Sequence, residues 1–256
     1  MTTVSIVTIV KDDAQGLQRT YSSVRTQNAL NWEMLIVVGA STDNSAELAD
    51  EFSNENDSVK VIRQESRGIF SAMNEGLNYA SGEFIWFMNS GDIFAGPEVL
   101  GLACNEIAKS SLGLVVGGYQ FRRNAIVSKY TFRRKKITPL SFAFSRRGGC
   151  HQAMIFRTSY VKGIGGFNLK YKANSDFLLA LSIIKMGGGQ RVSEIYADIE
   201  PGGFADQNIF MVHKEKHELR KSFFSSKWVN LLSNCWTYAA RCKILSRRLI
   251  QGRWAK

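Results

Sequence analysis

Through roughly the first hundred residues, short apolar runs alternate with longer segments in which apolar residues recur at helical spacing. The apolar runs are rich in β-branched residues and have the length of buried strands. They cover Val4–Val10, Met34–Val38, Val59–Ile62 and Phe84–Met88. The helical segments lie near residues 16–27, 44–54, 69–80 and 97–109. This alternation predicts an α/β fold in which helices flank a mostly parallel sheet.

The pattern becomes less regular after residue 111. Leu114–Phe121 and Ala153–Phe156 predict two further strands, and Asn174–Met186 has the spacing of a helix. The basic segment between residues 122 and 147 has no clear period. We therefore expect the sheet to be completed by a second half of different construction.

The last part of the chain differs from the rest in both period and charge. Its apolar residues recur at steps of four and three, which is the pattern of an amphipathic helix. They are Phe224, Trp228, Leu231, Cys235, Tyr238, Cys242, Leu245 and Leu249. Residues 211–256 carry a net charge of +9, whereas residues 1–210 carry +2. We expect a domain over 1–210, with halves 1–110 and 111–210, followed by a basic, amphipathic helical tail.

This tail has three possible roles. It can pack on its own domain, lie in the interface of an anionic membrane with its aromatic residues among the headgroups, or bind a protein partner. No apolar run of the chain reaches the ~18–20 residues that span a bilayer. If a membrane is the partner, we expect the tail to lie on it.

The cysteines and the start of the sequence favour a reducing compartment. Cys104, Cys150, Cys235 and Cys242 form no Cys-x-x-Cys pair, and no segment like a cleaved signal peptide precedes the first apolar run. We expect reduced thiols in a cytoplasmic protein that is peripheral at the inner face of the cytoplasmic membrane.

Short polar and acidic residues follow each of the four predicted strands. Lys11 and Asp12 follow the first strand, Ser41 and Asp43 the second, Glu65 and Arg67 the third, and Asp92 the fourth. In a parallel sheet, ligands bind beyond the carboxyl ends of the strands. The residues therefore predict a site for a polar ligand and allow a cation within it.

Six ordered segments carry a resemblance to a known family. They are Val4–Ile9, Ala40–Ser45, Gly68–Gly76, Gly82–Phe94, His151–Phe156 and Tyr171–Asp176. Together they resemble the family 2 glycosyltransferases of the GT-A fold, most closely the bacterial enzymes of colanic-acid, capsule and O-antigen (lipopolysaccharide) assembly. The resemblance covers roughly residues 3–205 and excludes the tail.

The resemblance implies a metal at Asn89-Ser-Gly-Asp92, which looks like the family's acidic motif after the fourth strand. Mg²⁺ or Mn²⁺ binds oxygen ligands and keeps diphosphate oxygens and waters in its shell. Asp92 would supply the anchoring charge, with Asn89 in support. Taken alone, Asn-Ser-Gly-Asp would be interpreted as a turn.

The resemblance also implies that Asp176 is the general base of an inverting, hexosyltransferase-type reaction. The base would take the proton of the acceptor hydroxyl while the anomeric carbon is attacked opposite the diphosphate. The alternative is that Asp176 is only a favourable charge at a helix N-terminus.

Other predicted site residues follow from the strand ends and the motifs. Those expected to bind the donor are Thr8, Ser41, Asp43, Arg67 and Asn89. Asp43 can instead cap the helix that begins near Asn44. His151 and Gln152 match the family's His-Gln pair, so we expect them in the active site, where His151 contacts either the diphosphate or the acceptor.

Two departures from the family pattern affect donor recognition. Relatives carry an acid in the loop after the second strand, where this chain has Val38 and Gly39, and an Asp where this chain has Ser71. These departures indicate a different recognition of the donor nucleotide, for example through Asp43 and backbone groups.

These residues lead to one main hypothesis and two alternatives. The first is transfer of a sugar from a UDP- or GDP-sugar to a hydroxyl of a lipid-linked oligosaccharide in surface polysaccharide biosynthesis. The second is a non-catalytic nucleotide-sugar-binding or scaffold protein derived from such an enzyme. The third is a nucleic-acid binder acting through the tail, but no nucleic-acid module is recognisable, so we expect no nucleic-acid partner.

Overall fold

The computed structural model describes residues 4–28, 31–109, 111–123, 126–145, 149–235 and 237–238. It divides into two compact units, Met1–Pro201 and Gly202–Lys256. This boundary lies earlier in the chain than the one that the charge pattern predicts, after residue 210.

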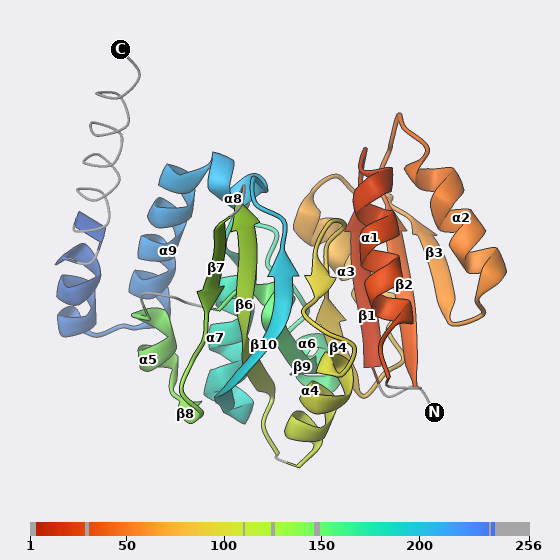
Figure 1. The fold of residues 1–256 in the computed structure, drawn as a ribbon. Coiled ribbons are helices and arrows are strands. Elements are labelled where there is room, and N and C mark those ends of the chain that lie inside the picture. Colours follow the sequence, from red (N-terminus) through yellow and green to blue (C-terminus); the bar gives the residue numbers. More distant parts are fainter. Residues whose placement is uncertain are drawn as a thin grey trace. The chain divides into compact units, whose positions relative to one another are not determined.

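A single mixed sheet forms the centre of the first unit (Figure 1). The strands that the described residues form are β1 Val4–Val10, β2 Trp32–Val38, β3 Val59–Arg63, β4 Phe84–Phe87, β5 Ile93–Phe94, β6 Leu114–Arg123, β7 Ile126–Tyr130, β8 Lys135–Ile137, β9 Met154–Arg157 and β10 Gly189–Ile199. Their order is β3-β2-β1-β4-β9-β6-β10-β5, with β7 paired to β6 and β8 to β10. β1–β4, β6 and β10 run in one direction, while β9 runs antiparallel between β4 and β6. The predicted α/β fold with a mostly parallel sheet is confirmed.

Helices cover both faces of this sheet. They are α1 Ala14–Arg25, α2 Ser45–Glu55, α3 Ile69–Tyr79, α4 Val99–Ala108, α5 Pro139–Ala143, α6 Thr158–Gly163 and α7 Ser175–Gly187, with a 3₁₀ turn, η1, at His151–Ala153. On one face, α1, α2 and α4 pack on alternate strand residues such as Ile6 and Trp86. On the other face, α3 approaches so closely that a Cβ on Gly76 would lie 2.4 Å from Val7 Cγ1. Because successive side chains of a strand point to opposite faces of the sheet, Ile6 and Val7 pack into the cores on opposite faces.

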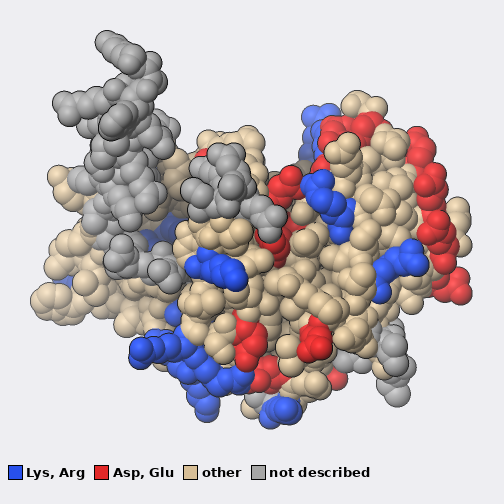
Figure 2. All heavy atoms as spheres, in the orientation of Figure 1, with Lys and Arg blue, Asp and Glu red and all other residues tan. Residues whose placement is uncertain are grey.

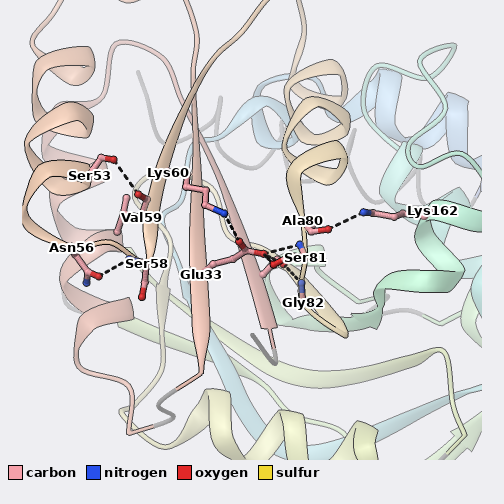
Figure 3. A network of polar contacts seen from close by, with 11 residues as sticks. Glu33, Ser53, Asn56, Ser58, Val59, Lys60, Ala80, Ser81, Gly82 and Lys162 are labelled. Carbon is pink, nitrogen blue, oxygen red and sulfur yellow. Dashed lines mark hydrogen bonds and ion pairs between the residues drawn. The ribbon is translucent and has the colours of Figure 1, made fainter. Parts of the chain in front are cut away.

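A buried carboxylate joins three strands at the edge where β1, β2 and β4 begin (Figure 3). Glu33 Oε1 accepts hydrogen bonds from Ser5 Oγ and from Ser81 N and Oγ, each at 2.7 Å. Lys60 Nζ lies 3.3 Å from Glu33 Oε2, and Gly82 N donates to Ser5 Oγ at 2.8 Å. Burial alone would raise the pKa of Glu33, but the donors from Ser5, Ser81 and Lys60 outweigh it and lower that pKa. We call these five residues the Glu33 cluster.

The second half contains elements that the sequence pattern did not predict. β10 is the longest of them, and the basic segment 122–147 contains β7, β8 and α5. β8 pairs with the start of β10, so Lys135 and Lys136 lie at the edge opposite the carboxyl ends of β1 and β4. Figure 2 shows basic side chains gathered where β8 lies and acidic side chains along α2. The run Arg133–Lys136 therefore does not border the predicted site.

The second unit contains α8 Phe204–Gln207, α9 Ile209–Phe223 and a helix over residues 227–235. His217 of α9 lies 2.9 Å (Nδ1) from Ser233 Oγ and 3.3 Å from Thr237 Oγ1. Ser233 and Thr237 are buried, whereas Trp228 and Tyr238 are 77% and 73% exposed. Within this unit the helix thus turns polar residues inward and large apolar residues outward. Cys242, Leu245 and Leu249 of the predicted stripe lie outside the described residues.

In the part of the chain that the structure describes, no helix is both long enough and apolar enough to span a membrane. The three cysteines of that part, Cys104, Cys150 and Cys235, form no disulfide bond.

Candidate active site

The loops that follow β1 and β2 are tied together by hydrogen bonds. Asp12 has a left-handed backbone with φ of 52°, and its Oδ1 accepts from Thr42 N at 2.6 Å and from Thr42 Oγ1 at 3.0 Å. Asp43 Oδ2 accepts from Ala14 N at 3.0 Å, and Asp43 Oδ1 accepts from Ser45 Oγ at 2.6 Å. These donors lower the pKa of both carboxyls, chiefly the Thr42 amide for Asp12 and the Ser45 hydroxyl for Asp43. The result is a braced pair of loops at the carboxyl edge of the sheet.

Asp92 is the buried acid at this edge. It is 4% exposed, and its Oδ2 accepts from Gln152 Nε2 at 2.8 Å while its Oδ1 accepts from Glu200 N at 2.9 Å. Burial raises the pKa of Asp92 to about 6, the two hydrogen bonds and His151 oppose this, and the Glu200 charge adds to it. The ionised carboxylate is therefore less stabilised here than in water, which suits a site that gains a positive ligand.

Asp176 and Asn89 lie on either side of His151. His151 Nδ1 is 3.1 Å from Asp176 Oδ2, and His151 Nε2 is 3.3 Å from Asn89 Nδ2. The side chains of His151 and Asp176 are 13% and 22% exposed. Asn89 Oδ1 is buried and has no hydrogen-bond partner in the part of the chain that the structure describes. Five of the predicted residues are thus brought together, because His151 contacts Asn89 and Asp176 while the adjacent Gln152 contacts Asp92.

The η1 turn makes this linkage possible. It follows Cys150 and leads into β9, which pairs with β4. Trp86 Nε1 of β4 donates to Gln152 O at 2.8 Å, and Cys150 Sγ contacts Gln152 Oε1. The pairing of β4 with β9 therefore brings residues 151–152 next to the motif that follows β4, although some sixty positions separate them in sequence.

Glu200 and Arg19 are site neighbours that the sequence pattern did not single out. Glu200 follows β10 and forms an ion pair with Arg19 of α1, and its amide holds Asp92. Gly91 has φ of 89°, and a Cβ there would lie 2.4 Å from Glu200 Oε2. The glycine of Asn89-Ser-Gly-Asp92 thus both permits the turn and makes room for Glu200. An acid directly after a strand was a signal that could have found it.

The remaining predicted donor residues are placed as follows. Thr8 is fully buried in β1, with no partner for its hydroxyl among the described residues. Ser41 Oγ accepts from Asp12 N at 3.1 Å. The N-cap position of α2 is Asn44, whose side chain makes no capping hydrogen bond, but Asp43 Oδ1 accepts from Ser45 N at the start of α2 at 3.0 Å. Asp43 Oδ2 also accepts from Ala14 N, so Asp43 holds the first turn of both α2 and α1. Arg67 is exposed. Within the described part of the chain, none of the four is hydrogen-bonded to the group around His151, so their contact with a donor stays a prediction.

A cation would find two kinds of oxygen here. The described residues contain no group of three or more His, Cys, Asp and Glu side chains that could enclose a metal. Asp92 supplies one carboxylate, and Asn89 Oδ1 is a buried acceptor without a partner in the described part of the chain. Such a sparse set fits Mg²⁺ or Mn²⁺ only if diphosphate oxygens and waters supply the other ligands.

Comparison with known proteins identifies the family of this chain. Residues 5–165 match the family described as glycosyl transferase family 2. The chain belongs to this family. An uncharacterized glycosyltransferase of Mycobacterium tuberculosis is 32% identical over 189 residues, which cover 71% of this chain and 70% of that protein.

A second relative is named for a specific transfer reaction. It is the UDP-Glc:alpha-D-GlcNAc-diphosphoundecaprenol beta-1,3-glucosyltransferase WfgD of Escherichia coli, 30% identical over 184 residues, with coverage of 71% of this chain and 70% of that protein. The relationship confirms the family resemblance that the six ordered segments carry.

Solved structures of low identity share the fold. TarS of S. aureus in complex with UDP-GlcNAc has a TM-score of 0.71 at 18% identity, covering 86% of this chain and 65% of that chain. The mannosyltransferase PcManGT of Pyrobaculum calidifontis in complex with GDP-Man and Mn²⁺ has a TM-score of 0.65 at 14% identity, covering 98% of this chain and 79% of that chain. The fold is therefore that of GT-A glycosyltransferases. This family 2 chain spans just under two thirds of the TarS chain.

Proposed function

We propose that this family 2 chain is an inverting glycosyltransferase that moves a hexose from a nucleoside diphosphate to a hydroxyl of a lipid-linked oligosaccharide in the assembly of a surface polysaccharide. The carrying observation is that two acids from different halves of the first unit, Asp92 and Asp176, are held by consecutive side chains of one turn, His151 and Gln152. Asp92 would hold the cation that binds the departing diphosphate, and Asp176 would take the proton of the attacking hydroxyl.

Asp176 has the features of a general base. It lies in the first turn of α7, its Oδ1 accepts from Phe177 N at 2.7 Å, and its Oδ2 is held by His151. A carboxylate held in this way can take the proton of an acceptor hydroxyl as the oxygen attacks the anomeric carbon. The new C–O bond forms on the face opposite the departing diphosphate, so the anomeric configuration inverts.

Asp92 and Asn89 are the residues that would hold Mg²⁺ or Mn²⁺ together with the diphosphate. When bound, such an ion neutralises the negative charge that develops on the leaving nucleoside diphosphate. Asp92 is fixed by Gln152 and by the Glu200 amide, so its carboxylate is preorganised for this purpose.

The donor and acceptor classes are supported by the relatives. WfgD is named for UDP-Glc and a diphosphoundecaprenol-linked acceptor, and the structural neighbours hold UDP-GlcNAc or GDP-Man. We propose a UDP- or GDP-sugar as donor. The braced loops carrying Asp12 and Asp43, together with Ser41 and Arg67, are the proposed surroundings of the nucleotide.

A thermal-shift screen tests the function. The purified protein is heated with UDP-Glc, UDP-GlcNAc and GDP-Man, each with and without Mn²⁺. We expect one donor to raise the melting temperature, and to do so more strongly with Mn²⁺, which Asp92→Asn should prevent. The stabilising donor is then incubated with undecaprenyl-diphosphate-linked acceptors, and the anomeric configuration of the product is determined by NMR.

The same experiments distinguish the proposed transferase from a protein that only binds the nucleotide sugar. A donor that binds without any transfer, equally well in the wild type and Asp176→Asn, would favour a non-catalytic nucleotide-sugar-binding protein. Retention of the donor's anomeric configuration in the product would contradict the inverting mechanism.

We further propose that the second unit attaches the enzyme peripherally to an anionic membrane, which would place it at the inner face of the cytoplasmic membrane. The helix over residues 227–235 exposes Trp228, Leu231 and Leu232, which are 77%, 53% and 56% exposed. Ser233 of this helix and Thr237, just beyond it, contact His217 of α9 instead. Apolar side chains on one face combined with a net charge of +9 over residues 211–256 suit an interfacial helix on anionic lipid.

Vesicle flotation tests this attachment. The full chain should float with vesicles containing phosphatidylglycerol and much less with vesicles of phosphatidylcholine alone. The triple change Trp228→Ser, Leu231→Ser and Leu232→Ser should abolish flotation, while Ser225→Ala should not. Equal binding of wild type and triple variant would exclude this face as the membrane contact, and dimerisation lost in the triple variant would identify it as a protein interface instead.

A further inference from the structure

The η1 turn contacts both acids of the site through neighbouring side chains. His151 reaches Asp176, and Gln152 reaches Asp92. We propose that His151 is a positioning residue: as the tautomer with its proton on Nδ1, it orients the Asp176 carboxylate and is itself oriented by the Asn89 amide. The inference rests on the proposed function, because it assigns to His151 a role toward the proposed base.

The direction of the hydrogen bonds follows from the groups involved. An ionised carboxylate only accepts, so Asp176 Oδ2 requires a proton on His151 Nδ1. The nitrogen that faces His151 Nε2 is Asn89 Nδ2, an amide that only donates. In this arrangement Nδ1 is the donor and Nε2 the acceptor. The chain of donors runs from Asn89 through His151 to Asp176.

The direction of these hydrogen bonds argues against His151 as the base. A base needs a lone pair directed at the substrate, and the Nε2 lone pair of His151 already accepts from Asn89. The Nδ1 side donates to Asp176. Both ring nitrogens are thus engaged, so the imidazole holds its neighbours in place while Asp176 receives the acceptor's proton.

The turn that carries His151 is itself well anchored. Ala153 N donates to Cys150 O at 2.9 Å, and Met154 N donates to His151 O. Trp86 Nε1, from the fully buried indole of β4, donates to Gln152 O. A ring mounted on such a turn can fix a carboxylate within the narrow tolerance that proton transfer requires.

The same hydrogen bonds also orient Asn89. With Nδ2 committed to His151, Oδ1 remains a buried acceptor without a partner among the described residues. An acceptor in this state can bind a hydroxyl of the donor sugar or share a cation with Asp92. His151 thereby couples the orientation of the base to that of a ligand-binding amide.

A pair of substitutions distinguishes the two nitrogens. The amide nitrogen of Asn lies close to the place of Nδ1 in His, whereas that of Gln lies close to the place of Nε2. We expect His151→Phe to lower kcat about 100-fold with a smaller change in the KM for the donor. His151→Asn should restore most of kcat because it keeps a donor toward Asp176, and His151→Gln should not. His213→Asn, a change in the second unit, is the matched control and should leave kcat within twofold.

The tautomer is measured without any substrate. Long-range ¹⁵N–¹H NMR spectra of protein labelled at histidine should show His151 protonated at Nδ1 and not at Nε2, with the signal assigned by its loss in His151→Asn. Because this measurement needs no donor, it tests the positioning role even if the transfer reaction is not found.

Three results would overturn the proposal. They are a proton on Nε2 in the NMR spectra, restoration of kcat by Gln to the level reached by Asn, and a His151→Phe variant with at least half of the wild-type kcat. Absence of any transfer by the wild type, with the Nδ1 tautomer observed, would count against the proposed function and leave the hydrogen-bond direction established.

Discussion

Two buried carboxylates stand at opposite edges of the same sheet, and burial has opposite outcomes for them. Glu33 and Asp92 are each 4% exposed. Glu33 receives three hydrogen bonds at 2.7 Å and an ion pair with Lys60, and its pKa is lowered despite burial. Asp92 receives two hydrogen bonds, lies near the Glu200 charge, and has its pKa raised to about 6.

The difference separates a structural cluster from a reactive one. The Glu33 cluster satisfies its charge within the protein and ties β1, β2 and β4 together. At the other end of β4, the protein leaves Asp92 incompletely stabilised and Asn89 Oδ1 without a partner in the described part of the chain. Groups whose stabilisation is incomplete until a ligand arrives are typical of functional sites.

The largest expected effect is a loss of kcat when Asp176 is replaced. Asp176→Asn removes the proposed proton acceptor and should lower kcat by about 10³-fold, because general bases contribute between roughly 10² and 10⁴. Steady-state kinetics with the donor found by thermal shift measures this. The matched change at the opposite edge, Glu33→Gln, should leave kcat within about twofold, and a large loss of kcat there would break the comparison.

Asp92→Asn should separate activity from stability. Loss of the anchoring carboxylate should lower Mn²⁺-dependent transfer by about 10²-fold to 10³-fold. The unfolding free energy at pH 8 should stay equal or rise, since the variant removes a buried negative charge. Urea unfolding with and without Mn²⁺ measures the second part. A strongly destabilised Asp92→Asn variant would show that this acid is as structural as Glu33.

Glu33→Gln should lower the unfolding free energy by about 2 kcal/mol. The neutral amide loses the charge-assisted character of bonds to Ser5 and Ser81 and the attraction of Lys60. Chemical denaturation at pH 7 measures the change, with Glu51→Gln on the exposed surface of α2 as control. Equal stabilities for the two variants would remove the structural role assigned to this cluster.

Asp92 and Glu33 should also affect the unfolding free energy in different pH ranges. The native-state pKa of Asp92 is raised from 3.8 to about 6, so its contribution to stability falls as pH rises from about 4 to 7, by up to about 2 kcal/mol. The native-state pKa of Glu33 is lowered, so its contribution is present above its ordinary pKa of 4.5 and is lost as pH falls below that value.

Unfolding experiments across pH 3–8 read out both contributions. The stability of Asp92→Asn relative to wild type should grow between pH 4 and 7, while the deficit of Glu33→Gln should shrink below about pH 4.5. A pH-independent difference for either variant would contradict the corresponding pKa shift.

The fold of the first half was predictable because its elements are locally regular. The strands expected at Val4–Val10 and Val59–Ile62 are observed at Val4–Val10 and Val59–Arg63. In the second half, β10 was missed because its pairing with β6 shifts register between Arg191 and Ile195 and again before Ala197. Such irregularities break the period-2 alternation by which a strand is identified from sequence.

The candidate site shows the same division. The residues following β4, the pair His151 and Gln152, and Asp176 at the start of a helix all stood out in the sequence as separate motifs. Their roles remain proposals, but their convergence is a structural observation. Glu200 and Arg19, 181 positions apart, did not stand out, because nothing local connects the end of β10 to α1.

The amino-acid pattern thus determined the class of fold, the family and most of the polar residues at the sheet edge, since periodicity and short motifs are local properties. Only the tertiary structure decided which buried acid is satisfied and which is not. The charge state of Glu33 or Asp92 depends on donors such as Ser81, Gln152 and Glu200. These donors come from distant segments and reach the acids only through the pairing of β4 with β1 and β9 and the path of β10.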